Sequence, residues 1–491
     1  MTVVSLSLVS HTNAGKTTLA RTLLLQDVGE VRDAPHVTEL ATAHELIATP
    51  QGDSLRLWDT PGFGDSARLV KRMSLSHQPL FWLLSEVWDR WRDRAFWASQ
   101  RAVRHVQDES DVVLYLVNAA ESPEAAGYVA PEMDLLAWVG KPVLVLLNQL
   151  GPPRAAADEL ADVQAWRAQL ARWPLVKQVL PLDAFARCWV HEATLLSAVQ
   201  SVLTGDEAAA MGRLSAAWAA QREAVFGQAM QALAASLARI AAARQGVEGE
   251  AGWTERFRRL GAALAQREAQ GEDKSPAAAA QRALAAALEA EVREHLARLI
   301  ALHGLQGRAQ GEILQRVAGQ FAVRERVPEG RAAIIGGAVT GAVAGLKADI
   351  LSGGLTLGGG LLAGGLLGAL GAAGVARGIN VVRGTGRSWV AWSDEALNSA
   401  VQAALLRYLA VTHFGRGRGD WQQGEAPAHW RQTVAEVMLA QQAAFDAIWR
   451  SRGQRFDDPD DESALTVALQ APLTQAARAV LWRLYPDAPQ T

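Results

Sequence analysis

One short segment near the start of the chain restricts its fold more than any other feature of the sequence. Residues 10–17 read SHTNAGKT and follow an apolar run, residues 3–9, that has the composition of a β-strand. A helix-compatible segment, residues 18–25, follows directly. A loop that joins a strand to a helix in this way points backbone N–H groups and the positive end of the helix dipole at one place, which suits a polyphosphate. The segment therefore predicts a phosphate-binding P-loop.

The residue types within this loop assign its chemistry. The Lys16 ammonium is expected to reach the β and γ phosphates of a nucleoside triphosphate, and the Thr17 hydroxyl is expected to coordinate Mg²⁺. Backbone N–H groups of the neighbouring residues complete the predicted cofactor-binding cradle; these residues are Asn13, Ala14, Gly15 and Thr18. Ser10 stands where the usual pattern has glycine, and its small side chain is compatible with the same loop.

A second motif follows at the distance that a P-loop protein requires. The sequence DTPG ends an apolar run, residues 54–58, and lies roughly 40 residues after the P-loop. Asp59, at the end of this predicted strand, is expected to hold the metal and its water shell. The Gly62 N–H is expected to sense the γ-phosphate, so that the loop after it can adopt two states.

The segment before the second predicted strand should supply one more oxygen ligand. Thr38 is the expected switch threonine, which closes over Mg²⁺ and the γ-phosphate, and Thr42 is the competing choice. The predicted metal ligands are therefore Thr17, Thr38 and Asp59, and the residues with predicted catalytic roles are Lys16, Thr38 and Gly62.

Recognition of the base is the least regular part of the pattern. Guanine-selective proteins usually carry N-K-x-D, whose aspartate accepts two hydrogen bonds from the base. Here Asn148 is in place, but Gln149 replaces the lysine and no carboxylate follows. In a later loop the Ala184 N–H is expected to meet the base carbonyl, while Asp183 either supplies the missing carboxylate or only caps the next helix. The choice between GTP and ATP therefore stays open on these residues.

The residues that would drive hydrolysis also depart from the usual pattern. Phe63 follows Gly62, where many GTPases carry a glutamine that orients the attacking water, and an apolar side chain cannot do this. Slow hydrolysis is the consequence. Asn13 suggests that K⁺ stimulates hydrolysis, because an asparagine three residues before the P-loop lysine can bind K⁺ together with the phosphates. The alternative is that Asn13 only braces the loop.

The first 204 residues alternate between strand-like and helical segments. This alternation is typical of an α/β fold with a mostly parallel sheet and helices on both faces. The strand-like runs are residues 3–9, 45–49, 54–58, 112–117, 143–147 and 177–182. We therefore expect residues 1–204 to form one nucleotide-binding domain.

Beyond residue 204 the composition shifts to Ala, Leu, Arg and Glu with helical spacing. Ser275 and Pro276 are expected to begin one long helix that ends near residue 303. The expected segments are a helical domain at 205–330, a Gly/Ala/Leu-rich helical hairpin at 331–386 and a C-terminal helical domain at 387–491.

Glycines recur every four residues in the middle of these segments, which places them on one face of a helix. They are Gly337, Gly341 and Gly345, and then Gly360, Gly364 and Gly368. A membrane-spanning helix needs about 20 apolar residues. Three interpretations remain open: a glycine-zipper hairpin in or on a membrane, a soluble packed hairpin, and a seam between copies in a homo-oligomer.

Charge and cysteine content exclude several classes of protein. The formal net charge is −3, so there is no net basic field for a nucleic-acid partner, and none is expected. Cys188 is the single cysteine, which excludes an internal disulfide and fits a reducing compartment. The N-terminal residues resemble a strand and lack the features of a signal peptide. We expect a cytoplasmic protein, associated with the inner face of the cell membrane if the glycine-rich hairpin binds lipid.

The motifs together resemble a known group of proteins. SHTNAGKTT, DTPG and the pair Asn148-Gln149 are similar to the Era/TrmE-like branch of the TRAFAC class of P-loop GTPases. The later sequences LDAFARCW, GLKADILSGGLTLGGG and RYLAVTHFGRGRGDW resemble an uncharacterised bacterial family that joins such a domain to a long helical C-terminal region. The resemblance implies a Ras-like P-loop NTPase fold, with GTP and Mg²⁺ as cofactors.

Two hypotheses follow for the whole chain. The first is a slow, Mg²⁺-dependent GTPase that acts as a molecular switch, with a membrane-associated helical effector region and a protein effector that the sequence does not identify. The second is a nucleotide-stabilised structural or assembly protein with little hydrolysis, or one that binds ATP instead of GTP.

Overall fold

The structure is a computed structural model of the full 491-residue chain. It describes residues 1–11, 14–24, 42–63, 66, 68–70, 94–150, 156–182, 188–247, 276–305, 379–384, 387–413, 428–452 and 461–486. The chain forms two compact units. The first contains Met1–Ala224, Thr412–Asp420 and Tyr485–Thr491, and the second contains Val225–Val411 and Trp421–Leu484. Each unit is described by itself.

The first unit is built on a six-stranded sheet with the order β2-β3-β1-β4-β5-β6. β2 runs antiparallel to β3, and the other neighbouring strands are parallel. The strands are β1 (Val3–Ser10), β2 (Thr42–Ala48), β3 (Ser54–Asp59), β4 (Val112–Asn118), β5 (Val143–Asn148) and β6 (Val176–Pro181). This sheet confirms the mostly parallel P-loop fold that the sequence predicts.

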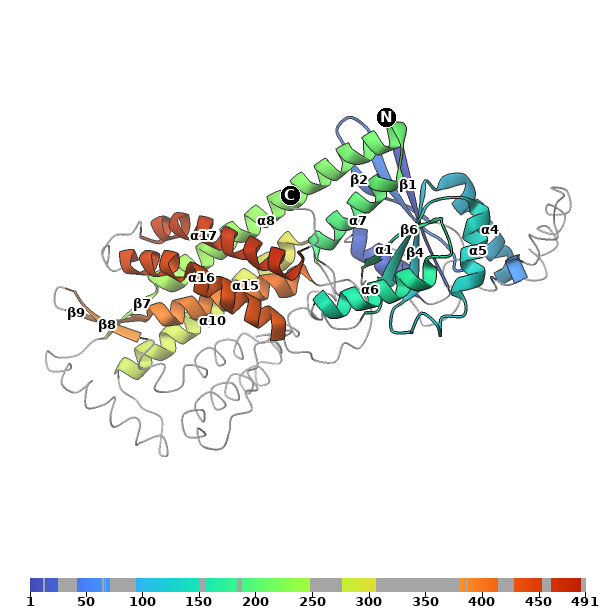
Figure 1. Ribbon diagram of the computed structural model, residues 1–491. Coiled ribbons are helices and arrows are strands. Elements are labelled where there is room, and N and C mark those ends of the chain that lie inside the picture. Colours follow the sequence, from blue (N-terminus) through green and yellow to red (C-terminus); the bar gives the residue numbers. More distant parts are fainter. Residues whose placement is uncertain are drawn as a thin grey trace, which may run out of the picture. The chain divides into compact units, whose positions relative to one another are not determined.

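Helices cover both faces of the sheet (Figure 1), so its central strands are buried on both sides, and β4 and β5 consist of continuous apolar runs. One face packs against α1 (Lys16–Leu24), α7 (Trp189–Val202) and the first part of α8 (Gly205–Ala242). The opposite face packs against α4 (Arg94–Glu109), α5 (Val129–Val139) and α6 (Ala156–Leu170).

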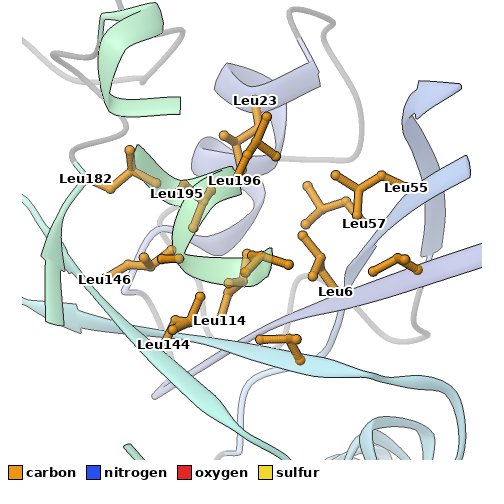
Figure 2. Close-up of a cluster of buried hydrophobic side chains, with 14 of the residues drawn as sticks. Leu6, Leu23, Leu55, Leu57, Leu114, Leu144, Leu146, Leu182, Leu195 and Leu196 are labelled. Atoms are coloured by element: carbon orange, nitrogen blue, oxygen red, sulfur yellow. The ribbon is translucent and has the colours of Figure 1, made fainter. Parts of the chain in front are cut away.

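Side chains alternate between these two cores along each strand, as the two-residue period of a β-strand requires. On β4, Leu114 belongs to the α1/α7 core and Tyr115 to the α4/α5/α6 core. Figure 2 shows the first of these cores, where Leu6 and Leu57 from the strands lie near Leu23 of α1. The two cores hold the sheet rigidly, and the loops at its edge are positioned by that frame.

α8 is a single helix of 38 residues, about 57 Å long at roughly 1.5 Å per residue. Its first half is fixed to the first unit by polar contacts as well as by packing. Arg213 Nε donates to Asp53 Oδ2 (2.6 Å) in the turn between β2 and β3. Trp218 Nε1 and Arg222 donate to Glu192 of α7, at 2.9 and 3.1 Å. The residues of α8 from Val225 onward belong to the second unit.

Two late segments of the chain also belong to the first unit. His413, just after α15 (Asp394–Thr412), forms a hydrogen bond through its Nε2 with the hydroxyl of Tyr485, which follows α17 (Asp461–Leu484). The Tyr485 ring also meets the edge of His191, with 4.5 Å between the ring centroids. His191 lies in the first turn of α7.

The second unit is mainly helical, which confirms the class predicted for the C-terminal region. Its helices are the rest of α8, α10 (Pro276–Leu302), α15, α16 (Ala428–Arg452) and α17. α10 begins at Pro276, as the helix-start signal predicts. Buried Arg452 ties this unit together, because its guanidinium donates to Ala241 O (3.3 Å) and Trp392 O (2.8 Å).

The segments after residue 204 that were expected to be mainly helical also contain short strands. β7 (Arg244–Val247), β8 (Ile379–Gly384) and β9 (Arg387–Trp392) form an antiparallel sheet with the order β7-β9-β8. The sequences INVVRG and RSWVAW are rich in β-branched and aromatic residues and are separated by two residues. This is the pattern of a hairpin, and the glycine-rich composition before it obscured the signal.

Among the helices that the structure describes, none is both long enough and apolar enough to cross a membrane. Most of the predicted glycine-zipper hairpin, residues 331–378, lies outside the described residues. The three interpretations of that hairpin therefore stay predictions.

Candidate functional site

The candidate site lies at one edge of the six-stranded sheet, where the carboxyl ends of neighbouring parallel strands meet. β1 ends at Ser10, β3 at Asp59 and β5 at Asn148, and each of these residues opens a loop with a predicted role. Ligands bind at this edge in open parallel sheets, because the loops from several strands converge there. The topology thus brings together motifs that are far apart in the sequence.

At one position of the P-loop, only glycine fits the backbone conformation and the available space. Gly15 has φ of +91°, a left-handed conformation that side chains disfavour. A Cβ at this residue would stand 2.7 Å from Nδ2 of Asn148. The same Nδ2 donates a hydrogen bond to Ala14 O (2.8 Å), so Asn148 braces the loop from the end of β5. Asn148 therefore contributes to the shape of the phosphate loop, in addition to its predicted role near the base.

Lys16 begins α1 and is buried. Its Nζ donates to Ser10 Oγ (3.1 Å), and the Ser10 hydroxyl donates in turn to His11 O (2.5 Å). Burial lowers the pKa of the Lys16 ammonium, and the negative charges of Asp59 and Glu132 oppose that shift. The serine that replaces the usual glycine thus has a definite place: its hydroxyl links the lysine to the loop backbone.

The two predicted metal ligands that the structure describes are in contact. Thr17 Oγ1 donates to Asp59 Oδ2 (2.6 Å). The other carboxylate oxygen, Oδ1, is buried, and it has no hydrogen-bond partner in the part of the chain that the structure describes. Burial raises the pKa of Asp59, while Thr17 and Lys16 act in the opposite direction. A hydroxyl beside a buried, incompletely satisfied carboxylate is an oxygen donor set that fits Mg²⁺.

The DTPG segment is held against the P-loop by its own backbone and side chains. The Thr60 hydroxyl donates to Leu8 O, and the Phe63 N–H donates to Ser10 O (3.2 Å). Gly62 O accepts a hydrogen bond from the Ser99 hydroxyl (3.4 Å). The Phe63 side chain is fully buried in the α4/α5/α6 core. This side chain therefore belongs to the core.

The base-recognition side of the site is described in part. Asn148 O accepts from the Ala119 N–H (2.7 Å), so the ends of β4 and β5 are joined here. Gln149 has φ of +61°, which turns the chain sharply after β5. Cys188 is buried and caps the start of α7. The residues predicted for this site that lie outside the described ones are Asn13, Thr38, Asp183 and Ala184. Their roles stay predictions.

Sequence reasoning did not single out a polar cluster beneath the P-loop. His11 Nδ1 lies 2.8 Å from Glu132 Oε1, and the Tyr115 hydroxyl donates to Glu132 Oε2 (2.6 Å). The His11 ring stacks on Tyr128, with 4.6 Å between the ring centroids. The hydrogen bond to the Glu132 carboxylate raises the pKa of His11, although burial opposes the shift. The available signal was Glu132, one of two acidic residues inside the apolar helix VAPEMDLLAWV.

Comparison with known proteins identifies both parts of the chain. Residues 5–149 match the family model described as 50S ribosome-binding GTPase. Residues 167–471, more than half of the chain, match the family model described as Domain of unknown function (DUF3482). No curated protein matches the chain at a significant level.

Several solved structures are similar to part of the chain. An Era variant from Aquifex aeolicus bound to GDP and AlF4⁻ shares 17% identity over 42% of this chain and 59% of its own, with a TM-score of 0.30. A structure of Era in complex with MgGDPNP and nucleotides 1506–1542 of 16S ribosomal RNA gives the same values. An SsGBP variant shares 17% identity over 37% of this chain and 50% of its own, with a TM-score of 0.23. The chain spans 59% of the length of these Era structures.

Fold, motifs and family matches agree. The N-terminal part is a P-loop GTPase domain, with the mostly parallel sheet and the motifs of that class, and the remainder is mainly helical. The chain belongs to the DUF3482 family, and it joins this helical domain to an N-terminal GTP-binding P-loop GTPase domain.

Proposed function

We propose that this protein is a Mg²⁺-dependent GTPase of low intrinsic turnover that acts as a molecular switch for its helical C-terminal region. One arrangement carries the proposal. The Thr17 hydroxyl contacts the Asp59 carboxylate at 2.6 Å, and the buried Lys16 ammonium lies close enough to influence the pKa of that carboxylate. A hydroxyl, a carboxylate and a lysine at the start of a helix are the groups that a triphosphate and its magnesium require.

The residues of this site bind and orient; they do little covalent chemistry. Lys16 and the P-loop N–H groups hold the phosphates and offset their charge. Thr17 and Asp59 hold Mg²⁺, which supplies positive charge to the phosphate oxygens when bound. Phe63, with its side chain in the core, has no group that aligns a water molecule. This combination supports tight binding with slow hydrolysis.

The Asp59→Asn variant is expected to bind Mg²⁺ and GTP at least about tenfold more weakly than the wild type, because the amide keeps the shape but removes the charge that holds the metal. With a chelator in place of Mg²⁺, the variant and the wild type should have similar affinities. Equilibrium titration with a fluorescent GTP analogue measures both conditions.

The matched control is Asp108→Asn, which removes the same charge from an exposed position on α4. It should behave as the wild type does. An Asp59→Asn variant that keeps full Mg²⁺-dependent affinity would overturn the assignment of the metal site.

The preference for guanine is part of the proposal and rests on the match to a GTPase family. Asp183 and Ala184, which precede α7 in the sequence, are proposed to contact the base. Measured affinities for GTP and ATP test this, for the wild type and for Asp183→Ala. Equal affinities of the wild type for the two nucleotides would contradict the guanine assignment.

The contacts of α8 support a switch. Asp53, the partner of Arg213, lies in the hairpin between β2 and β3, and along the chain this hairpin stands between Thr38 and Asp59. A movement of either switch residue would therefore act on the hairpin to which α8 is bonded. The same helix continues without a break into residues of the second unit. We propose that α8 carries the state of the nucleotide to the helical region and its protein effector.

Two further elements of the proposal have direct tests. Asn13 is proposed to bind K⁺ with the phosphates, so phosphate release should be faster in K⁺ than in Na⁺. Equal rates in the two salts would contradict this role of Asn13.

The glycine-zipper segment is proposed to contact the inner face of the cell membrane. Recovery of the protein wholly in the soluble fraction, with either GDP or a GTP analogue, would eliminate that contact.

A second function is favoured by the burial of Phe63. A chain that binds nucleotide without aligning water would act as a nucleotide-stabilised assembly protein. Steady-state phosphate release separates the two functions. If the wild type shows no turnover even with membranes and K⁺, while Lys16→Ala abolishes its function in cells, the assembly role is correct.

A further inference from the structure

The Glu132 carboxylate is buried in the first unit and contacts the P-loop residue His11. Glu132 belongs to the first turn of α5 and is fully buried. Its two oxygens have different partners: Oε1 faces His11 Nδ1 at 2.8 Å, and Oε2 accepts from the Tyr115 hydroxyl at 2.6 Å. Burial of a carboxylate is costly unless its oxygens are satisfied, and loss of one partner is strongly destabilising. The buried Glu132 carboxylate therefore depends on His11 and Tyr115 to satisfy its two oxygens.

His11 connects this carboxylate to the phosphate-binding groups. Its carbonyl oxygen accepts hydrogen bonds from the Ser10 hydroxyl (2.5 Å) and the Ala14 N–H (3.4 Å). The Ser10 hydroxyl in turn accepts from Lys16 Nζ (3.1 Å). A displacement of His11 would move the carbonyl on which this chain of hydrogen bonds depends. The contact of the His11 side chain with Glu132 thus joins the P-loop backbone to α5.

We propose that His11 is a positioning residue of the phosphate loop, held by Glu132 as an ion pair, and that nucleotide binding is coupled to a proton on its imidazole. This inference rests on the proposed function and deepens it, because it names a residue that tunes the same site. His11 does not touch the reacting atoms; it acts through the backbone that carries Ser10 and Lys16.

The charges around His11 determine the direction of the coupling. Glu132 on α5 and Glu121 after β4 favour the protonated ring, while Lys16 on α1 and partial burial disfavour it. The other titratable groups packed there are the hydroxyls of Tyr115 and Tyr128, whose pKa values burial raises, so both stay neutral. Together these groups raise the pKa of His11 above 6.5. A bound triphosphate adds negative charge nearby and favours the imidazolium further.

The sign of the pH dependence follows from this direction. The pKa of His11 is raised in the folded chain, so the stabilisation from the ion pair is fully present below about pH 6.5, the ordinary histidine value. It is lost as the pH rises through the folded pKa. Nucleotide affinity should follow the same course, being highest on the acid side and falling as His11 loses its proton.

Calorimetric titration of the full-length protein with GDP and Mg²⁺ tests the coupling, from about pH 6 to about pH 8.5. We expect the affinity of the wild type to fall about tenfold more over this range than that of His11→Gln, which corresponds to the coupling of one proton over about one pH unit. The terminal phosphate of the nucleotide itself titrates near pH 6, so the difference between the two proteins is the diagnostic quantity. Titrations in two buffers of different ionisation enthalpy should show proton uptake by the wild type that His11→Gln lacks.

Two further variants separate positioning from simple structural damage. His11→Arg carries a permanent charge and should restore most of the affinity while removing the additional pH dependence. His105→Gln, which changes another half-buried histidine of the same unit, should keep the wild-type profile. Glu132→Gln should weaken binding as His11→Gln does; because it changes the core, circular dichroism must show that it is folded.

The titrations distinguish failure of the proposed nucleotide binding from failure of the proposed role of His11. If the wild type does not bind GDP at any pH, the proposed function fails. If the wild type binds, but His11→Gln has the same affinity, pH profile and proton uptake, then the positioning role of His11 is wrong and the nucleotide site stands.

Discussion

Replacement of Lys16 by alanine is expected to weaken the binding of GTP and Mg²⁺ by roughly 100-fold to 1,000-fold. The ammonium is buried at the start of α1. Charge-assisted hydrogen bonds contribute about 1.5–3 kcal/mol each, so the two expected with the β and γ phosphates account for about 3–4 kcal/mol. The measurement is equilibrium titration of the folded variant with a fluorescent GTP analogue.

The same variant should not be less stable than the wild type. Burial lowers the pKa of the Lys16 ammonium, so the folded chain holds this charge at an energetic cost, and its removal is not expected to lower the free energy of unfolding. Weak binding by a stable protein would therefore report a lost contact and not misfolding. The control is Lys177→Ala, which removes an exposed lysine from β6 and should leave affinity unchanged. Unchanged affinity in Lys16→Ala would contradict the predicted role of Lys16.

The second large effect concerns Gly15. Its φ is +91°, and a Cβ at this residue would stand only 2.7 Å from Asn148 Nδ2, so there is no room for a side chain. Gly15→Ala is expected to lower the free energy of unfolding by about 2–4 kcal/mol, since a left-handed alanine costs about 1–2 kcal/mol and Asn148 must also give up its hydrogen bond to Ala14. Denaturant unfolding measures this loss, and the affinity for GTP should fall with it.

Substitutions at two other glycines separate the backbone cost of Gly15→Ala from the cost of its clash with Asn148. Gly140 has φ of +77° with nothing within 4 Å of a Cβ, so Gly140→Ala should show the backbone cost alone, about 1–2 kcal/mol. Gly227 lies within α8 with open space and no left-handed φ, so Gly227→Ala should raise stability by about 0.5–1 kcal/mol. If Gly15→Ala costs no more than Gly140→Ala, then Asn148 does not brace the P-loop as described.

Much of the first unit could be predicted because its signals are local. The runs that become β4 and β5 are uninterrupted hydrophobic stretches, because these strands are buried on both faces, and β1 and β3 are mostly apolar strands bounded by turn residues. The two phosphate-site motifs each stand at the end of such a strand. Their meeting at one edge of the sheet then follows from parallel pairing, and the contact of Thr17 with Asp59 is consistent with it.

Contacts between distant residues could not be predicted in the same way. His11 and Glu132 are 121 positions apart, and Arg213 and Asp53 are 160 positions apart. Neither pair forms a spacing pattern, because the fold alone brings them together. Glu132 stood out only as an acid within an apolar helix, and nothing in the sequence indicated that its partner was a residue of the P-loop.

The second unit shows a different limit. Long Ala- and Leu-rich stretches predicted α10 and α15–α17 as helices, since helical periodicity sums over many residues. The hairpin of β8 and β9 was missed because each strand has six residues, and the glycine-rich segment before it suggested a different element. Short strands give a weak signal when the neighbouring composition is biased.

The central claim is that a P-loop lysine, a threonine and an aspartate bind a guanine nucleotide with magnesium. Calorimetric titration of the purified full-length chain with GTP tests it most directly, once with Mg²⁺ and once with a chelator. We expect saturable binding at one site per chain, stronger with Mg²⁺ than without it and stronger for GTP than for ATP. Absence of any Mg²⁺-dependent uptake of GTP by the folded protein would contradict the claim.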